Sequence, residues 1–246
     1  MLDIVWEDAR ILAVNKPAGL ATAPGRDDPQ CVLDEIDGPP DVDGRPTRLR
    51  LVHRLDKQTS GLLLLAKDRE AQRHLCQQFL NRTVEKEYLA LIAGKPIADQ
   101  GEIDAPLGKS AKSDVYMAVV KHGAPAVTRW EVVNRFRVYS LLRCFPKTGR
   151  THQIRVHLKS IGLPLAVDPL YNPPRSGEAP GIFLSRFKRD YHEKKDQVER
   201  PLIGRLSLHA ARIAFLDMEG KRIELECPPP KDFRAAINML GKYGGR

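Results

Sequence analysis

The sequence predicts a single folded unit that mixes β-strands with helices. Its 246 residues are enough to bury a substantial apolar core. Hydrophobic residues make up 42% of the chain and charged residues 29%, which is ordinary for a soluble globular protein. Short apolar runs bounded by turn residues alternate with two stretches of helical period, without an internal repeat or a low-complexity tract. We therefore expect one mixed domain.

The first quarter of the chain is expected to hold strands joined by a long surface loop. Residues 4–14 contain two β-prone runs separated by a polar break, and the Pro and Gly within residues 15–20 then turn the chain. Residues 25–50 are rich in Asp, Pro and Gly, so only residues 31–36 are able to form a short helix. The short run Leu62 to Ala66 is uniformly apolar, which is typical of a buried strand.

A first amphipathic helix is predicted directly after this strand. The Asp68 side chain can cap it, and Ala71, Leu75 and Phe79 recur every four residues on one face. That face should pack against the sheet. Strand character returns at residues 84–93, 126–133 and 139–145, and a hairpin at 206–227 closes the fold.

A second helix is predicted within residues 151–162. Thr151 can cap its start, Ile154, Leu158 and Ile161 share a helical face, and Gly162 ends it. The helix therefore follows a polar, basic turn.

The overall charge favours polyanionic partners. The chain has 40 Lys and Arg against 31 Asp and Glu, a formal charge of +9, so RNA, DNA and anionic membrane surfaces all remain open. The first residues lack a basic start followed by an apolar core, and no apolar run could span a bilayer, so we expect a cytoplasmic protein. Four scattered cysteines without a CxxC pair predict neither a redox motif nor a zinc site.

Two polar segments are candidates for chemistry. In residues 53–56, HRLD, Asp56 lies at a turn that enters a buried strand, where a carboxylate can be held rigidly as a catalytic acid; the alternative is a turn-closing residue. Residues 148–157 open a helix that carries Arg155, which favours anionic partners; the alternative is a solvated basic face. At about 4 Å and an effective dielectric near 20, these two charges would interact by roughly 4 kcal/mol and keep the carboxylate ionised.

Cofactor patterns are missing from the sequence. His152 and His157 lie five residues apart without an acidic residue between them, whereas two metal ligands on one helical face usually lie four apart. The glycines fit neither dinucleotide-binding nor P-loop spacing. We expect neither a metal site nor a nucleotide cofactor.

One motif carries a specific resemblance. Residues 53–61, HRLDKQTSG, resemble the HRLDxxTSG signature of RluA-type pseudouridine synthases. Further segments agree with that family in the expected order: NKPAGL at 15–20, EKEYLA at 85–90, TGRTHQIRVHL at 148–158 and LHA at 208–210. Together they extend over nearly the whole chain.

The resemblance implies an isomerase that converts uridine to pseudouridine in structured RNA, without a cofactor. It implies an α+β fold in which residues 1–246 form one catalytic domain: a long mixed, mostly antiparallel sheet, flanking helices and a central RNA-binding cleft. The target RNA, ribosomal or transfer, is left open. We also expect a monomer.

The same resemblance assigns roles to individual residues. Asp56 takes the place of the essential carboxylate, Arg155 of the arginine that pairs with it, and Tyr88 of the ring that stacks on the target base. Two further positions match substrate contacts: Ile154 packs near the base, and Arg54 contacts RNA where the uridine leaves its stack. The remaining members of the expected RNA-binding set are His53, Arg150 and His152.

Three features depart from the family pattern. The motifs begin almost at Met1, so we expect no S4 RNA-binding domain, and RNA must be held by the catalytic domain itself. Val167 replaces the usual glycine of a GD-x-x-Y segment, which puts the local backbone in doubt. Residues 183–205 interleave basic and aromatic side chains, as an RNA-contacting arm or as a solvated loop. The basic residues considered there are Arg186, Lys188, Arg189, Lys194 and Lys195.

Two other classes of function compete with this reading. A catalytically silent RNA-binding or RNA-folding protein would keep the RNA surface without the reaction, and intact Asp56, Tyr88 and Arg155 argue against it. A glycoside hydrolase would need a second essential Asp or Glu beside Asp56. The arginine-rich segment at 148–158 favours RNA rearrangement instead.

Overall fold

A computed structural model of the chain describes residues 2–25, 29–38, 40, 46–111, 113–188, 191 and 198–244, with the backbone alone for 113–115. The chain divides into two compact units. Unit 1 comprises Met1–Glu87 and His209–Pro228, and unit 2 comprises Tyr88–Leu208 and Pro229–Arg246. The prediction that residues 1–246 act as one catalytic domain stays a prediction.

Unit 1 is built on a mixed sheet. Its strands follow the order β1-β2-β4-β11, with β3 paired to β4 and β12 paired to β11. The β4–β11 pair is parallel and the other pairs are antiparallel. The strands are β1 (Asp3–Glu7), β2 (Ile11–Lys16), β3 (Arg50–Leu51), β4 (Ser60–Ala66), β11 (Leu208–Leu216) and β12 (Arg222–Glu226).

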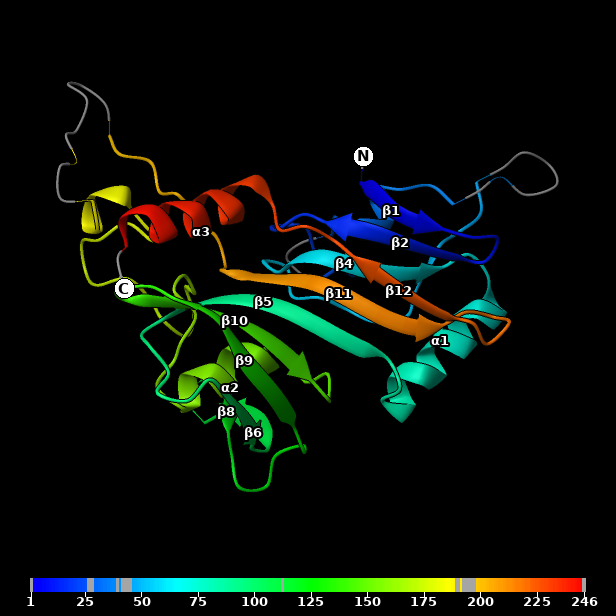
Figure 1. Ribbon diagram of the computed structural model, residues 1–246. Coiled ribbons are helices and arrows are strands. Elements are labelled where there is room, and N and C mark those ends of the chain that lie inside the picture. The colour runs from blue at the N-terminus through cyan, green and yellow to red at the C-terminus, as the bar shows by residue number, and fades with distance from the viewer. Residues whose placement is uncertain are drawn as a thin grey trace. The chain divides into compact units, whose positions relative to one another are not determined.

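Helix α1 (Arg69–Asn81) covers part of this sheet (Figure 1). The Asp68 carboxylate accepts hydrogen bonds from the backbone amides of Glu70 and Ala71, which confirms the predicted cap. Ala71 and Leu75 are buried in one cluster with Leu62 and Leu64 of β4. The first strands, the buried strand, α1 and the closing hairpin are thus confirmed, and the predicted short helix is a 3-10 turn, η1 (Val32–Asp34).

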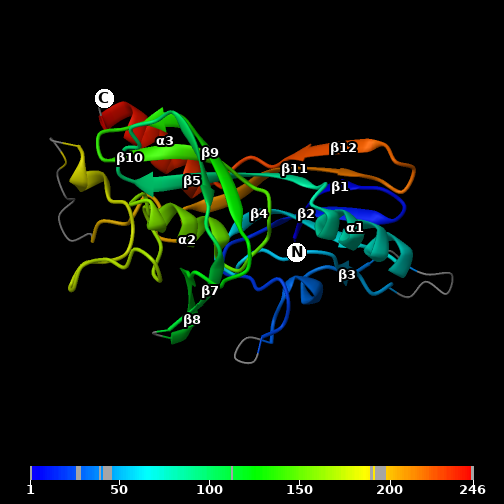
Figure 2. The same cartoon turned by 90° about the horizontal axis from the view of Figure 1, so that it is seen from below.

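Unit 2 places two helices on opposite faces of an antiparallel sheet with the order β5-β10-β9-β6 (Figure 1). Figure 2 shows β7 and β8 as a separate two-stranded ribbon. The strands are β5 (Glu85–Ala93), β6 (Gln100–Asp104), β7 (Leu107–Ser110), β8 (Ser113–Val119), β9 (Val127–Arg135) and β10 (Tyr139–Pro146). The helices are α2 (Gln153–Ser160), the 3-10 turn η2 (Leu184–Arg186) and α3 (Lys231–Tyr243).

Side-chain alternation along β5 explains this layering. Ala90 and Ile92 are buried in the cluster that holds Ile154 of α2, whereas Leu91 is buried in the cluster that holds Phe233 of α3. Successive residues of a strand point to opposite faces, so one strand fills two cores. The mixed, largely antiparallel α+β class is confirmed.

Two details of the second predicted helix are wrong. The capping position is His152 rather than Thr151, with a left-handed backbone at φ 56°, and its side chain makes no cap hydrogen bond. Ile161 is 42% exposed and lies after the last helical residue, so it does not share the buried face of Ile154 and Leu158. Gly162 follows at φ 77°, which agrees with the predicted stop.

Candidate active site

Asp56 lies in unit 1 on the loop between β3 and β4, and its side chain is half-buried. The main chain fixes this loop. The Thr59 amide donates to the Asp56 carbonyl at 3.0 Å, and the Gly19 amide donates to the Lys57 carbonyl at 2.9 Å. Thr22 bonds to both backbone groups of Leu55, since its hydroxyl donates to the carbonyl at 2.8 Å and accepts from the amide at 3.1 Å.

Lys16 ties the loop that follows β2 to the Asp56 loop. Its ammonium group donates to the carbonyls of Pro17, Leu20 and Lys57 at 2.8, 2.7 and 3.0 Å. The residue is 0% exposed, so these carbonyls compensate for taking the charge out of water. The sequence marked residues 15–20 as a motif but gave Lys16 no role, because its acceptors are carbonyls that no sequence pattern displays.

His53 makes its contacts inside unit 1. The Leu64 amide donates to His53 Nε2 at 2.9 Å, and the imidazole stacks on Phe79 with ring centroids 4.5 Å apart. Burial, aided by the positive charge of Lys86, lowers the pKa of His53 to about 3. A neutral ring with this nitrogen occupied can support the loop, and the RNA contact of His53 stays a prediction. Arg54, by contrast, is exposed on the same loop, and its RNA contact stays a prediction.

The TSG and LHA motifs meet where β4 pairs with β11. His209 lies opposite Ser60 and Ala210 opposite Gly61. His209 Nε2 donates to the Cys227 carbonyl at 3.0 Å, which leaves Nδ1 to accept from the Ser60 hydroxyl at 3.0 Å. Gly61 has φ 114°, and a Cβ there would lie 2.2 Å from the Ala210 carbonyl oxygen. Only glycine allows this approach, which anchors the strand that follows Asp56.

In unit 2, Arg155 of α2 forms a buried ion pair with Asp168. Arg155 Nε and Nη2 each donate to one carboxylate oxygen of Asp168 at 2.8 Å, and the two side chains are 5% and 1% exposed. The Asp168 carboxylate also accepts from the amides of Leu170 and Tyr171 at 3.0 and 3.1 Å. These bonds fix the orientation of the guanidinium. Asp168 was not predicted as a site residue.

Tyr171 supports the same guanidinium from its ring face. The Arg155 guanidinium carbon lies 4.9 Å from the centre of the Tyr171 ring. The Tyr171 hydroxyl accepts from the Met117 amide at 2.9 Å and lies 2.8 Å from His152 Nδ1. His152 Nδ1 is therefore engaged within unit 2. The predicted RNA contact of His152 stays a prediction.

Gln153 holds the turn that leads into α2. Its side-chain carbonyl accepts from the Thr148 hydroxyl at 2.7 Å and the Arg150 amide at 3.0 Å. Its amide group donates to the Val127 carbonyl at 2.9 Å and to the Thr128 hydroxyl at 3.0 Å. Arg150 is exposed on this turn, and its Nε donates a hydrogen bond to the Pro125 carbonyl at 3.3 Å. Its guanidinium is accessible, as the prediction of RNA contact requires.

Tyr88 and Ile154 belong to one apolar cluster of unit 2. Ile154 is 6% exposed within it, and the half-buried Tyr88 on β5 packs against the same cluster. Unit 2 thus brings together an aromatic ring, an aliphatic side chain and the oriented Arg155. The predicted pairing of Arg155 with Asp56 stays a prediction.

Val167 does not disturb the segment before Asp168. Its side chain is 3% exposed and belongs to the cluster that contains Phe233. The backbone of Val167 is unstrained, because its φ is not positive. Its N–H donates to the Ser207 hydroxyl at 3.1 Å. A valine therefore fits where the family has glycine.

The basic segment at 183–205 is described in part. Arg186 Nη2 donates to Glu178 at 3.0 Å, and the Lys188 ammonium lies 5.3 Å from the centre of the Tyr243 ring. These two side chains therefore have contacts within unit 2. The others named above, Arg189, Lys194 and Lys195, lie outside the described residues.

Two searches of the described part of the chain gave negative results. No group of three or more His, Cys, Asp or Glu is arranged to hold a metal ion among the residues with described positions. None of the helices in the described ranges is long and apolar enough to cross a membrane.

Comparison with known proteins gives consistent matches. The sequence model of the family described as RNA pseudouridylate synthase matches residues 10–160. An uncharacterized RNA pseudouridine synthase of Bacillus subtilis is 38% identical over 99% of this chain and 74% of its own length. The ribosomal large subunit pseudouridine synthase D of Nitrosomonas europaea is 39% identical over 97% of this chain and 65% of its own length.

A solved structure agrees with these sequence matches. The human protein RNA pseudouridylate synthase domain containing 4 superposes with a TM-score of 0.73 at 27% sequence identity. The match covers 97% of this chain and 93% of the human one.

Proposed function

The chain belongs to the RNA pseudouridylate synthase family, and we propose that it isomerises uridine to pseudouridine in a structured RNA with Asp56 as its catalytic carboxylate. The observation that carries the assignment of Asp56 is its rigid loop. Lys16, Thr22 and Thr59 fix the backbone on both sides of it, while the carboxylate is half-buried. A positioned group of this kind suits chemistry better than a solvated turn.

The reaction breaks one bond and makes another within the same nucleotide. The bond between the ribose C1′ and the uracil N1 is cleaved, the base turns, and C1′ joins C5, whose proton is finally lost while N1 gains one. No atom is added overall. The carboxylate of Asp56 can act by attacking the base, by attacking the sugar or by removing a sugar proton, and all three routes need it ionised.

Reaching the target requires the uridine to leave its stack. Extrusion of a base costs a few kcal/mol, which contacts in the site must offset. We assign the stacking platform to Tyr88, the apolar contact to Ile154, and the contact with the vacated RNA stack to the exposed Arg54. Arg150 and His152 would contact the RNA backbone beside them.

Arg155 is proposed to hold the Asp56 carboxylate in its ionised form. Its guanidinium is already oriented by Asp168 and by the Tyr171 ring, so little rotational freedom remains to be lost. A guanidinium keeps its charge at all relevant pH values, and it stabilises a neighbouring carboxylate as the anion.

We propose large-subunit ribosomal RNA as the substrate. This is supported by relatives from Nitrosomonas europaea and Pseudomonas aeruginosa that are named ribosomal large subunit pseudouridine synthase D. The formal charge of +9 agrees with a polyanionic partner. We further propose that the protein acts in the cytoplasm, as a monomer.

Pseudouridine mapping tests the function and the RNA together. Total RNA from a strain that lacks the gene is incubated with the wild-type protein or with Asp56→Asn, and modified sites are mapped. New sites in large-subunit ribosomal RNA with the wild type alone are expected. Sites confined to transfer RNA would overturn the substrate. RNA binding without new sites for either protein would instead favour the silent RNA-binding alternative.

A further inference from the structure

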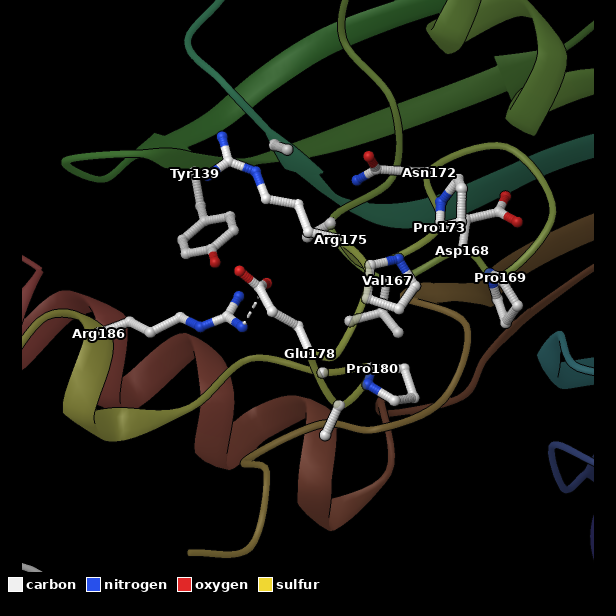
Figure 3. Close-up of a pocket in the computed structure, with 15 residues that line it drawn as sticks. Tyr139, Val167, Asp168, Pro169, Asn172, Pro173, Arg175, Glu178, Pro180 and Arg186 are labelled. Carbon is white, nitrogen blue, oxygen red and sulfur yellow. Dashed lines mark hydrogen bonds and ion pairs between the residues drawn. The ribbon is translucent and has the colours of Figure 1, made fainter.

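Unit 2 carries a pocket of about 220 Å³, and Asp168, the ion-pair partner of Arg155, is one of its lining residues (Figure 3). Its walls come from residues 166–186, and Ala93 and Tyr139, at the ends of β5 and β10, complete the lining. Its polar groups belong to Tyr139, Asp168, Asn172, Arg175, Glu178 and Arg186.

The walls of the pocket are preformed. Four of the lining residues are prolines, and each proline restricts its own backbone before a ligand arrives. Gly181 has φ 138°, and a Cβ there would lie 2.6 Å from Pro201 Cβ, so the loop is packed against its neighbour. An isolated antiparallel β-bridge between Ile182 and Ile203 joins the same loop to the segment that contains Pro201. A preformed site loses little conformational entropy on binding. The prolines are Pro169, Pro173, Pro174 and Pro180.

The charges around the pocket favour an anion. Arg186 is held by Glu178, and the Asp168 carboxylate points away from both of them (Figure 3). The Asp168 carboxylate is engaged by Arg155, which does not line the pocket. Arg175 is exposed, and its side chain has no hydrogen bond or ion pair to any residue with a described position. A guanidinium in this state is ready to bind a phosphate group.

The size and lining favour a single nucleotide. The volume lies below the roughly 300–1,000 Å³ typical of sites for drug-sized ligands and cofactors. The Tyr139 ring and the proline rings offer flat apolar surface, while Arg175 supplies the charge. Proteins that read RNA commonly accept unstacked bases against aromatic rings and arginine planes.

We propose that this pocket receives one unstacked nucleotide of the RNA substrate, other than the target uridine, with its phosphate on Arg175 and its base against Tyr139 and the prolines. This inference rests on the proposed function. Because Asp168 both lines the pocket and holds Arg155, the nucleotide would bind directly behind the arginine assigned to catalysis.

Charge variants test the phosphate contact. An unmodified large-subunit ribosomal RNA transcript is titrated with wild type, Arg175→Gln, Arg175→Lys and the control Arg234→Gln, which removes an exposed arginine of α3. Arg175→Gln should weaken binding about fivefold and lower the slope of log K against log salt by about 0.7, the value for one phosphate of a single strand. Arg175→Lys should keep the slope, since it keeps the charge.

A space-filling variant tests the base contact without changing charge. Ala179 lines the pocket and is exposed, so Ala179→Trp places an indole in the cavity without disturbing a buried core. It should weaken RNA binding by about fivefold or more, with the salt slope kept, because one stacked base is excluded. An Arg175→Gln protein that matches Arg234→Gln in affinity and slope would overturn the proposal, as would wild-type affinity for Ala179→Trp.

Product analysis on the same transcript separates this inference from the proposed function. If the wild type forms pseudouridine while the pocket variants bind RNA normally, the pocket proposal alone fails. If the wild type forms no pseudouridine in any RNA, the proposed function fails whatever the binding data show.

Discussion

The Asp56 loop of unit 1 and the Arg155 site of unit 2 are held in position by different means. Around Asp56, the bonds run to backbone carbonyls and amides, with buried Lys16 supplying three of them. Around Arg155, the bonds run to the functional side chain itself, through a bidentate pair with Asp168.

The difference bears on what each side chain can do. The hydrogen bonds of the main chain around Asp56 position its carboxylate through the backbone. Fixing the guanidinium of Arg155 restricts its rotation, and the orientation of this buried charge then depends on the buried Asp168 carboxylate. Loss of the Lys16 support in unit 1 should therefore mainly slow the reaction. Loss of the Asp168 support in unit 2 should mainly destabilise the fold.

The largest loss of stability is expected for Asp168→Asn. It removes the charge of one member of a buried ion pair, and breaking such a pair from one side costs about 3 kcal/mol or more. Urea unfolding measures the change. Asp232→Asn breaks the ion pair between Arg205 and Asp232, whose side chains are 18% and 38% exposed, respectively. This change should lower the free energy of unfolding by no more than about 1 kcal/mol. Equal losses for the two variants would contradict the contrast between buried and exposed pairs.

A moderate loss of stability and a clear loss of rate are expected for Lys16→Met. Three part-buried carbonyls lose a charged donor, which should lower the free energy of unfolding by about 2 kcal/mol. The displaced loop should also lower the single-turnover rate by about 10- to 100-fold. Lys231→Met, at an exposed position of α3, is the control. A Lys16→Met protein with the wild-type rate would show that this lysine does not position Asp56.

A smaller effect is expected in the dependence of stability on pH. The pKa of His53 is lowered to about 3 in the folded chain, below its ordinary value near 6.5. Between these values the unfolded chain binds more protons, so the stability contributed by neutral His53 is present above pH 6.5 and is lost as the pH falls toward 3.

Replacing His53 by Gln should remove this dependence. The slope of unfolding free energy against pH should then fall by at most about 1.4 kcal/mol per pH unit within that window, the value for one proton. Urea unfolding at pH 4.5, 5.5 and 7.5 tests this. An unchanged slope would mean that His53 titrates normally and is accessible, as the RNA-binding assignment requires.

Local patterns predicted much of the fold because the decisive contacts are close in sequence. Asp68 caps the helix that begins at the next residue, and the periodic or continuous runs of apolar residues identify α1 and β4 without knowledge of their partners. The start of α2 was missed by one residue because His152 is held in a left-handed conformation next to Tyr171, nineteen positions away. Helix α3 was not predicted, although Phe233, Ala236 and Leu240 form its buried face.

The site was predicted through its motifs rather than through its supports. Asp56 and Arg155 stand out because they lie in polar segments that resemble family motifs, yet nothing local to them shows which groups hold them. Lys16 lies 41 positions from Lys57, and Asp168 lies 13 positions from Arg155, so their hydrogen bonds exist only in the folded chain. The predicted RNA contact of His53 rests on its place in a motif, which does not display the hydrogen bond from Leu64 or the stacking on Phe79.

The central claim is that the Asp56 carboxylate carries the reaction on an RNA that other side chains bind and position. It is tested most directly by single-turnover conversion of the mapped uridine with wild type and Asp56→Asn, alongside RNA affinity in the same buffer. We expect Asp56→Asn to bind RNA within about threefold of wild type and to react at least about 10⁴-fold more slowly, as for loss of an essential group. Conversion by Asp56→Asn within about tenfold of the wild-type rate would contradict the account.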